Sequence, residues 1–321
     1  MILITGAAGF IGSCMAGKMN AEGFTDLTLI DNFQRSERQK NYRSKNHNHL
    51  VDRKAALQWI RSHEQHIQAV LHLGARTDTM ATEPGPFEEL NFSYSKELWK
   101  LCTAYQIPFI YASSAATYGD GKQGFEDDTS KLSELKPLNL YAKSKHNFDL
   151  WVQEQSESPF FWAGLKFFNV YGPNEYHKGR MASVVFHAFN QIQETGRLKL
   201  FKSQHPDYAD GMQKRDFIYV MDVVDVIFKL LSERKSSGLY NLGTGQARSF
   251  LDLAHAVFAA MDKEPAIDFI DMPEELRNNY QYFTEAPMDK LKATGIAFQP
   301  RTIEDGVSDY VCNFLQSEAY F

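Results

Sequence analysis

The sequence predicts an α/β protein with a doubly wound parallel sheet and a smaller α/β lobe toward the C-terminus. Its first half alternates short apolar runs with longer stretches that repeat apolar residues about every 3.6 positions, as helices do. Strand, helix and strand in repetition indicate right-handed crossover units, and these build a parallel sheet. The runs typical of strands buried on both faces are residues 1–5, 27–31, 69–75 and 109–114.

Helical periodicity covers residues 11–22 and 86–105, and the regular alternation ends near residue 172. The stretch 201–216 is polar and rich in turn residues, and strand signals return at 216–223 and 238–243. We therefore expect two parts, a large domain of 1–172 and 216–245 and a smaller lobe of 173–215 and 246–321.

Composition narrows the possible partners. The 321 residues, 43% of them hydrophobic, are enough for one large domain or for a large and a small domain. A formal charge of -6 argues against nucleic acid or an anionic membrane as the main partner, because both attract basic surfaces. No apolar run approaches the ~18 residues of a membrane span, and no basic leader precedes the first strand. We expect a cytoplasmic protein with a small-molecule substrate.

Neither disulfides nor a metal site is expected. Cys14, Cys102 and Cys312 are odd in number, far apart and in no metal-ligand spacing, which is typical of a reduced protein. His177 and His187 have no third ligand at a suitable spacing.

The first chemical motif is "TGAAGFIG", which places Gly6, Gly9 and Gly12 between the first strand and its helix. Such a turn lets the backbone approach a pyrophosphate, while the helix N-terminus supplies N–H groups and a partial positive charge. The alternative is a tight turn that merely needs small residues. Asp31 ends the second strand and would bind an adenosine ribose, which favours NAD. A 2′-phosphate would instead suit the basic residues that follow, Arg35, Arg38 and Lys40.

The second motif is "YAKSK", in which Tyr141 and Lys145 share one face of a helix that starts near Asn139. A phenol of pKa ~10 becomes a general base at neutral pH only when a nearby cation stabilises its anion. Just upstream, "YASSAATYG" ends a strand and brings Ser114 and Thr117 to the carboxyl edge of the sheet. A hydroxyl there would polarise a substrate oxygen, or would only cap the turn.

The third motif, "YGPNEYHKGRMAS", carries Lys178 and Arg180 behind a Gly-Pro turn. Lys178 has three interpretations: a solvated side chain, a phosphate anchor, or an acid/base whose pKa burial lowers toward neutrality. Arg215 in "KRDFIYV" would suit a bidentate contact with a diphosphate, the alternative being an ion pair with Asp216 or Asp222.

These motifs, with "NFSYSKELWKLC", "KPLNLYAKSK", "FFNVYGPNEYHKGRMASVVFH" and "NLGTG", resemble the extended short-chain dehydrogenase/reductase superfamily of nucleotide-sugar enzymes. The order and spacing are most similar to the ADP-L-glycero-D-manno-heptose 6-epimerase family, over residues 1 to about 315. The resemblance implies a Rossmann-type domain, bound NADP with NAD as the alternative, and an ADP-heptose substrate. It also implies a homo-oligomer, pentameric in the family, and a role in making the heptose precursor of lipopolysaccharide.

The resemblance also implies site residues. Its catalytic residues map to Tyr141, Lys178, Lys145 and Ser114. Its cofactor-binding residues map to Gly6, Gly9, Phe10, Ile11, Gly12, Asp31, Asn32, Arg38, Arg53, Leu73, Gly74, Ala75, Asn91, Tyr141, Lys145, Val170 and Lys178. Its substrate-binding residues map to Ser114, Asn169, Arg180, His187, Phe201, Lys202, Ser203, Gln204, Arg215 and Tyr280. The large domain would hold the dinucleotide, and the smaller lobe would hold the substrate.

Within the family, Lys178 matches a second acid/base that serves the opposite face of a C6 ketone from Tyr141. The sequence departs from the family at Ala142 and Lys143, at Arg180, and in a longer loop over 203–213. The rival functions are a UDP-hexose 4-epimerase, a nucleotide-sugar dehydratase and a non-catalytic NADP-binding module. Ala115 and Ala116 stand where a dehydratase needs an acidic pair, which disfavours dehydration.

Overall fold

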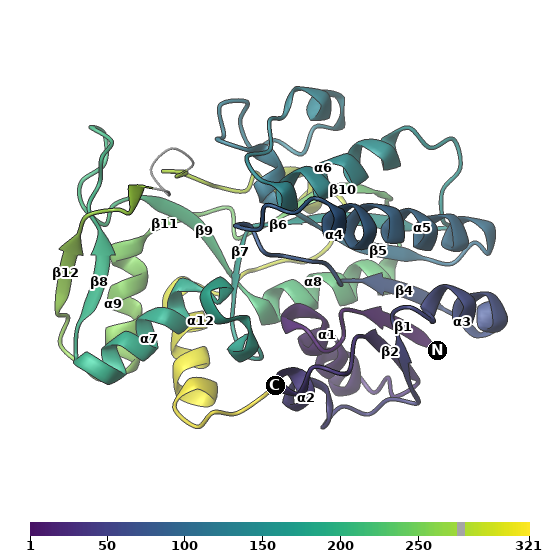
Figure 1. The fold of residues 1–321 in the computed structure, drawn as a ribbon, viewed down its shortest axis with the longest axis horizontal. Helices are drawn as coiled ribbons and strands as arrows, with labels where there is room; N and C mark the ends of the chain where they lie inside the picture. The colour runs from purple at the N-terminus through teal and green to yellow at the C-terminus, as the bar shows by residue number, and fades with distance from the viewer. Residues whose placement is uncertain (275–279) are drawn as a thin grey trace.

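The computed structural model describes residues 1–274 and 280–321. Its main element is a seven-stranded sheet in which every neighbouring pair is parallel (Figure 1). In spatial order its strands are β10 (Gly238–Leu242), β6 (Trp162–Phe167), β5 (Phe109–Ser114), β4 (Ala69–His72), β1 (Ile2–Thr5), β2 (Leu27–Asp31) and β3 (His49–Asp52).

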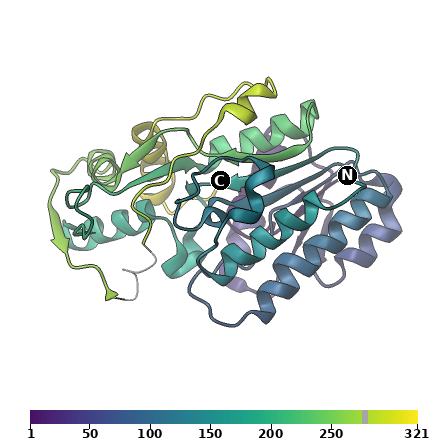
Figure 2. The same cartoon turned by 90° about the horizontal axis from the view of Figure 1, so that it is seen from above.

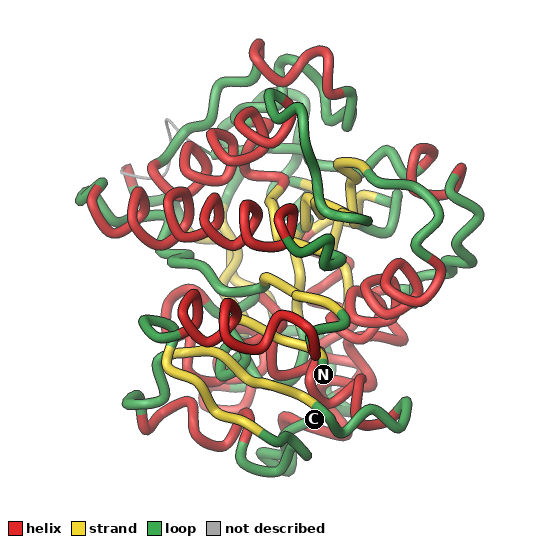
Figure 3. The backbone as a smooth tube through the Cα atoms, turned by 90° about the vertical axis from the view of Figure 1, so that its right-hand side faces the viewer, coloured by secondary structure: helices red, strands yellow, loops and turns green. Residues whose placement is uncertain are grey.

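Helices cover both faces of this sheet, as the view from above and the end-on view show (Figures 2 and 3). On one face α1 (Phe10–Ala21) packs against α8 (Val220–Glu233). On the other lie α3 (Ala56–His63), α5 (Tyr94–Ala104) and α6 (Leu140–Gln153). Shorter elements of this part are α2 (Gln39–Tyr42), α4 (Gly85–Phe87), the π-helical turn Glu88–Ser93 and the 3₁₀ turns Ser36–Arg38, Glu64–His66, Ala115–Tyr118 and Thr129–Glu134.

Two small sheets lie beside the main one. The first has the order β11 (Ala247–Ser249), β9 (Lys214–Tyr219) and β7 (Asn169–Tyr171), and the second pairs β12 (Ile267–Ile270) with β8 (Leu198–Phe201). The helices of this region are α7 (Val184–Thr195), α9 (Phe250–Ala260) and α12 (Ile303–Tyr310), followed by the π-helical turn Val311–Leu315. The 3₁₀ segment Tyr176–Met181 precedes α7, and α11 (Asp289–Ala293) contacts β10.

The predicted fold class is confirmed, and β1, β2, β4 and β5 lie within the predicted ranges, whereas β3 was not predicted. The predicted strand over 216–223 is wrong at its end, because β9 stops at Tyr219 and α8 begins at Val220. Val220, Val223 and Ile227 form the buried stripe of that helix, so tertiary burial outweighs the β-preference of their branched side chains. In the described part of the chain, no helix has the length and apolar character that crossing a bilayer requires.

The order of the strands reverses between β1 and β4, which is where open α/β sheets bind ligands. At this point the two strand ends nearly touch. Gly6 has φ 69°, and a Cβ there would lie 2.5 Å from the Gly74 Cα. Glycine is therefore required at Gly6 both for its backbone angle and for its contact.

Candidate active site

A cavity of about 660 Å³ opens at this reversal point. Its walls come from five places: the glycine-rich turn after β1, the end of β2 with the arginines beyond it, the loop after β4, the helical residues 86–94, and the 177–181 segment. The volume is within the range of small-molecule and cofactor sites.

The glycine-rich turn leaves the start of α1 open to a ligand. Gly9 is the N-cap, and no side chain caps the first N–H groups of the helix. A Cβ on Gly12 would lie 2.2 Å from the Gly6 carbonyl oxygen, so only glycine allows this tight packing. The turn thus presents uncapped N–H groups and the positive end of a helix dipole, which suit a pyrophosphate.

Asp31 lies buried at the end of β2 with both carboxylate oxygens engaged by the backbone. The N–H of Ala8 donates to Oδ2 at 3.0 Å, and that of Asn32 donates to Oδ1 at 2.7 Å. Arg38 approaches the same carboxylate at 3.8 Å, and Arg35 and Arg53 line the cavity nearby. Burial lowers the pKa of Arg38, with Asp31 opposing that shift.

Three polar atoms of the cavity lining are buried without a hydrogen-bond partner among the described residues: Arg38 Nε, Arg76 Nε and the Tyr94 hydroxyl. Buried donors are normally satisfied, so these atoms indicate that the cavity holds a polar ligand. Together with the glycine cradle, they fit a dinucleotide.

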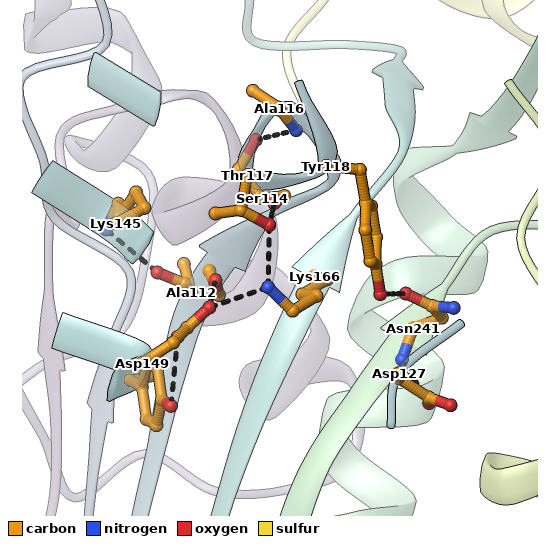
Figure 4. Close-up of polar contacts among 12 residues, drawn as sticks. Ala112, Ser114, Ala116, Thr117, Tyr118, Asp127, Lys145, Asp149, Lys166 and Asn241 are labelled. Carbon is orange, nitrogen blue, oxygen red and sulfur yellow. Dashed lines mark hydrogen bonds and ion pairs between the residues drawn. The ribbon is translucent and has the colours of Figure 1, made fainter. Parts of the chain in front are cut away.

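Tyr141 and Lys145 stand on α6 next to the end of β5, but they are not paired as expected. The Lys145 Nζ donates to the carbonyl of Ala112 at 2.8 Å (Figure 4). Burial raises the pKa of Tyr141, a hydrogen bond with Ser114 lowers it, and the Asp149 carboxylate raises it. The expected lowering by Lys145 is therefore absent here, because that ammonium binds a backbone carbonyl. Burial lowers the pKa of Lys145 to about 8.

Beneath these residues lies a fully buried ion pair between Asp149 of α6 and Lys166 of β6, 2.8 Å apart (Figure 4). The hydroxyls of Tyr111 and Ser113 donate to the same carboxylate at 3.1 and 2.6 Å. Lys166 also donates to the Thr117 hydroxyl at 2.6 Å, so Thr117 is engaged in this network. The network joins α6 to the strand end that carries Ser114.

Lys178 faces the cofactor cavity, where its Nζ lies 5.0 Å from the centroid of the Phe10 ring. Its Nζ makes no hydrogen bond or ion pair with the described residues 1–274 and 280–321. Burial lowers the pKa of this amine, while the Glu175 carboxylate opposes the shift. The amine thus lies in a cavity beside an aromatic ring, which fits a ligand-facing role for Lys178 better than a fully solvated side chain.

Arg180 forms an exposed ion pair with Asp78, in which one guanidinium nitrogen, Nη2, donates to both carboxylate oxygens at 3.0 and 3.1 Å. Both residues line the cavity, so the pair joins the loop after β4 to the segment that carries Lys178. Thr79 and Met181 touch beside it at 3.9 Å.

Arg215 is buried, and no carboxylate of the described chain pairs with it. Asp216 binds the N–H groups of Thr244, Gly245 and Ala286 instead, while Asp222 pairs with Arg301. The Arg215 guanidinium donates to the carbonyls of Lys214 and Gln281. Its central carbon lies 5.2 Å from the Tyr280 ring and 5.7 Å from the Phe250 ring.

An aromatic group extends from Tyr280. The Tyr282 ring lies 5.2 Å from that of Tyr280 and 5.6 Å from that of Tyr208, which the 203–213 loop supplies. Sequence reasoning named Tyr280 but missed Tyr208 and Tyr282. The alternation of Tyr280 and Tyr282 along an extended chain was the signal available for Tyr282.

The structure brings most of the predicted cofactor residues into one lining: Gly6, Gly9, Phe10, Ile11, Gly12, Asp31, Asn32, Arg38, Arg53, Leu73, Gly74, Ala75 and Lys178. Outside that lining are Asn91, Tyr141, Lys145 and Val170. Asn91 is buried and hydrogen-bonded to the backbone of Arg76 and to Ser144. Lining residues that the sequence did not reveal are Arg76, Thr77, Asp78, Tyr94, His177 and Met181.

The predicted substrate residues lie in several elements. Ser114 ends β5, Asn169 begins β7, His187 is in α7 and Phe201 ends β8. In the loop after β8, Lys202 pairs with Asp271 at 3.1 Å, the Ser203 N–H donates to Asp210 at 2.7 Å, and Gln204 is exposed. At the start of α6, where the sequence departs from the family pattern, Ala142 is buried and Lys143 is exposed.

Comparison with known proteins provides independent evidence on the family of this chain. The sequence pattern of the NAD dependent epimerase/dehydratase family matches residues 2–243. The chain is 45% identical to the ADP-L-glycero-D-manno-heptose-6-epimerase of Fusobacterium nucleatum, with 99% of each chain covered. It is similar to the crystal structure of the Helicobacter pylori ADP-L-glycero-D-manno-heptose-6-epimerase, with a TM-score of 0.82 and 26% identity over 97% of this chain and 95% of the other. It is also similar to the Thermus thermophilus UDP-glucose 4-epimerase in complex with NAD, with a TM-score of 0.75 and 25% identity over 97% of both chains.

Proposed function

We propose, because the chain belongs to the NAD dependent epimerase/dehydratase family and within it to the ADP-L-glycero-D-manno-heptose-6-epimerases, that it epimerises ADP-D-glycero-D-manno-heptose at C6. The observation that carries the proposal beyond family membership is the position of Lys178. A partly buried amine, without a hydrogen-bond partner among the described residues, faces the same cavity as the glycine-rich turn, where an epimerase needs a second acid/base.

The cofactor is a nicotinamide dinucleotide, and we assign it as NADP. The Asp31 oxygens are already bound by two backbone N–H groups, which leaves them less free for a ribose hydroxyl. Arg38, with its unpaired Nε, and the neighbouring Arg35 and Arg53 suit a 2′-phosphate. The start of α1 would hold the pyrophosphate. When bound there, the dinucleotide would supply reversible hydride transfer at C6.

Two residues would move the protons of this reaction. Tyr141, hydrogen-bonded to Ser114, would exchange the hydroxyl proton on one face of C6, and Lys178 would do so on the other. With both residues present, the substrate does not have to rotate within the pocket to bring the C6 oxygen of each epimer to the same base. Lys178 suits this role because burial lowers its pKa, against the opposing effect of the Glu175 carboxylate, and no ion pair with a carboxylate of residues 1–274 or 280–321 holds its amine.

The other end of the substrate would occupy the smaller lobe, 173–215 and 246–321. Arg215 has a buried guanidinium without a carboxylate partner, which suits a diphosphate. The adjacent Tyr280 offers an aromatic face to the nucleotide. We further propose that the enzyme is a cytoplasmic homo-oligomer, pentameric as the resemblance implies, that supplies a lipopolysaccharide heptose precursor.

The test is conversion of ADP-D-glycero-D-manno-heptose deuterated at C6, followed by NMR. The product should keep its label through many turnovers in ordinary water, because the hydride returns to the carbon it left. Tyr141→Phe and Lys178→Met should each lower kcat by roughly 10² to 10⁴ with little change in KM, as expected for loss of one general acid/base. Arg215→Ala is the binding control and should mainly raise KM.

Steady loss of the label to water would contradict the oxidation and reduction route. A Lys178→Met enzyme with normal kcat and a raised KM would instead make Lys178 a phosphate anchor.

A further inference from the structure

The segment that carries Lys178 is held through side chains that bind other parts of the chain, among them the Glu175 carboxylate, which accepts from the N–H and the hydroxyl of Ser183 at 2.6 Å each. It follows a turn at Asn174, which has a left-handed backbone with φ 72°, and Tyr176–Met181 then forms two short 3₁₀ turns that meet at a kink. Within it, Gly179 breaks the helical geometry with φ 53°. The position of the Lys178 amine therefore depends on what holds the residues before it.

Residues 319–321 contact this segment, and Figure 1 marks the C-terminal end of the chain beside α2. The Tyr176 hydroxyl donates to the Ala319 carbonyl at 2.7 Å, and the ring of Tyr320 lies 4.8 Å from that of Tyr176. The N–H of Phe321 donates to Asn174 Oδ1 at 3.0 Å, and Asn174 Nδ2 donates to the Phe321 main-chain oxygen at 3.2 Å.

The same three residues are anchored in the large domain. The Lys45 ammonium donates to the Phe321 main-chain oxygen, and the Lys40 ammonium lies 5.7 Å from the centroid of the Tyr320 ring. The Phe321 ring rests on α1, where a Cβ at Gly17 would come within 2.9 Å of it. Residues 319–321 thus connect α1 and α2 with the residues just before Lys178.

A second support acts from the cofactor side. The buried Asn41 amide donates to the carbonyls of Ala8 and Asn174 at 3.0 and 3.1 Å, and its Nδ2 lies 3.2 Å from His177 Nδ1. The turn before Lys178 is therefore held between the glycine-rich turn and residues 319–321.

We propose that residues 319–321 form a positioning strap that holds the 174–178 segment so that Lys178 faces the reacting carbon. The inference rests on the proposed acid/base role of Lys178. The strap residues do not touch the cavity, so their effect passes through Asn174 and Tyr176. Placement of a reacting group within about 1 Å is worth as much as 10²-fold in rate, so a loosened segment lowers turnover.

The test uses Asn174→Gly and Tyr320→Ala. Glycine keeps the left-handed backbone at position 174. It removes the side chain that binds Phe321 and that also donates to the Ser13 hydroxyl at 2.9 Å, so Tyr320→Ala is the variant that disturbs the strap without touching position 174. The matched control is Tyr320→Phe, since the ring makes the contact and the hydroxyl makes no hydrogen bond in the described chain. Both test variants should lower kcat by roughly 10- to 10²-fold with KM and co-purified dinucleotide unchanged, and Tyr320→Phe should match wild type.

A second readout follows the Lys178 amine directly. Its acetylation by an amine-reactive ester is measured by mass spectrometry over a range of pH. Glu175 and His177 are the titratable groups beside it, and both remain in the variants. Once the segment loosens, the amine becomes hydrated and its pKa rises toward the ordinary value, so acetylation begins at higher pH than in wild type.

Wild-type kcat and an unchanged acetylation profile in both variants would overturn the strap. So would an equal loss of kcat in Tyr320→Phe. If Lys178→Met keeps full kcat, the acid/base role fails instead, and the acetylation profile still decides whether residues 319–321 position the amine.

Discussion

We expect the buried ion pair of Asp149 and Lys166 to make a large contribution to the stability of the region around the carboxyl end of β5, where Ser114 lies. Both side chains have no exposed surface, and their charged atoms are 2.8 Å apart. In Asp149→Leu the carboxylate is lost, so the Lys166 ammonium and the hydroxyls of Tyr111 and Ser113 lose their acceptor. Removing one partner of a buried pair costs about 3–5 kcal/mol, because the other charge stays buried without compensation.

The double variant Asp149→Leu/Lys166→Met separates this cause from the general effect of changing the core. With both charges gone, the remaining pair of apolar side chains should recover most of the loss, since an apolar pair can replace a buried ion pair at little cost. The assay is denaturant unfolding followed by circular dichroism and by tryptophan fluorescence. Agreement of the two probes shows whether one free energy of unfolding describes the chain.

The matched control is Asp268→Asn, which breaks the exposed pair with Arg197 on the small sheet. That change should leave the unfolding midpoint close to wild type, because exposed pairs contribute little. The reasoning is refuted if Asp149→Leu unfolds at the wild-type midpoint, or if the double variant is no more stable than the single one.

Two further predictions concern the cofactor and acid stability. Arg38→Ala should weaken NADP binding by roughly 10- to 10²-fold, because one charge-assisted contact is lost, while NAD binding should change little. Fluorescence titration of the protein freed of bound dinucleotide measures both affinities. An equal loss for both dinucleotides would contradict a contact between Arg38 and a 2′-phosphate. Burial lowers the pKa of His72 from 6.5 to about 3, so between these values the unfolded chain binds a proton that the folded chain does not. Stability should fall by up to about 1.4 kcal/mol per pH unit as pH drops through that window. His72→Gln should remove this slope in denaturant unfolding at several pH values, and an identical acid profile would contradict the assignment.

The sheet and the glycine-rich turn could be predicted because their signals are local. Apolar runs of four to six residues and the spacing of Gly6, Gly9 and Gly12 are visible in the sequence itself. The end of β9 could not be predicted. The branched residues after Tyr219 suit a strand, and they form a helix only because α1 packs against them in the assembled fold.

The site was less accessible for a similar reason. The helical spacing of Tyr141 and Lys145 is local. The Ala112 carbonyl that accepts a hydrogen bond from the Lys145 ammonium, however, comes from β5, a separate element. Likewise, the pairing of Arg180 with Asp78 joins residues a hundred positions apart. Such contacts depend on the assembled fold, which propensity and periodicity do not encode.

The short sheet formed by β7, β9 and β11 has a mechanical consequence. β9 carries Arg215 at one end and runs directly into α8, which packs on α1 of the large domain. The ladders of β9 with β7 and β11 resist bending along this line, so we expect no wide hinge opening between the seven-stranded sheet and the small sheets. We therefore expect substrate to enter and leave through movement of surface segments such as 203–213, while the distance between Arg215 and the glycine-rich turn stays nearly constant through the catalytic cycle.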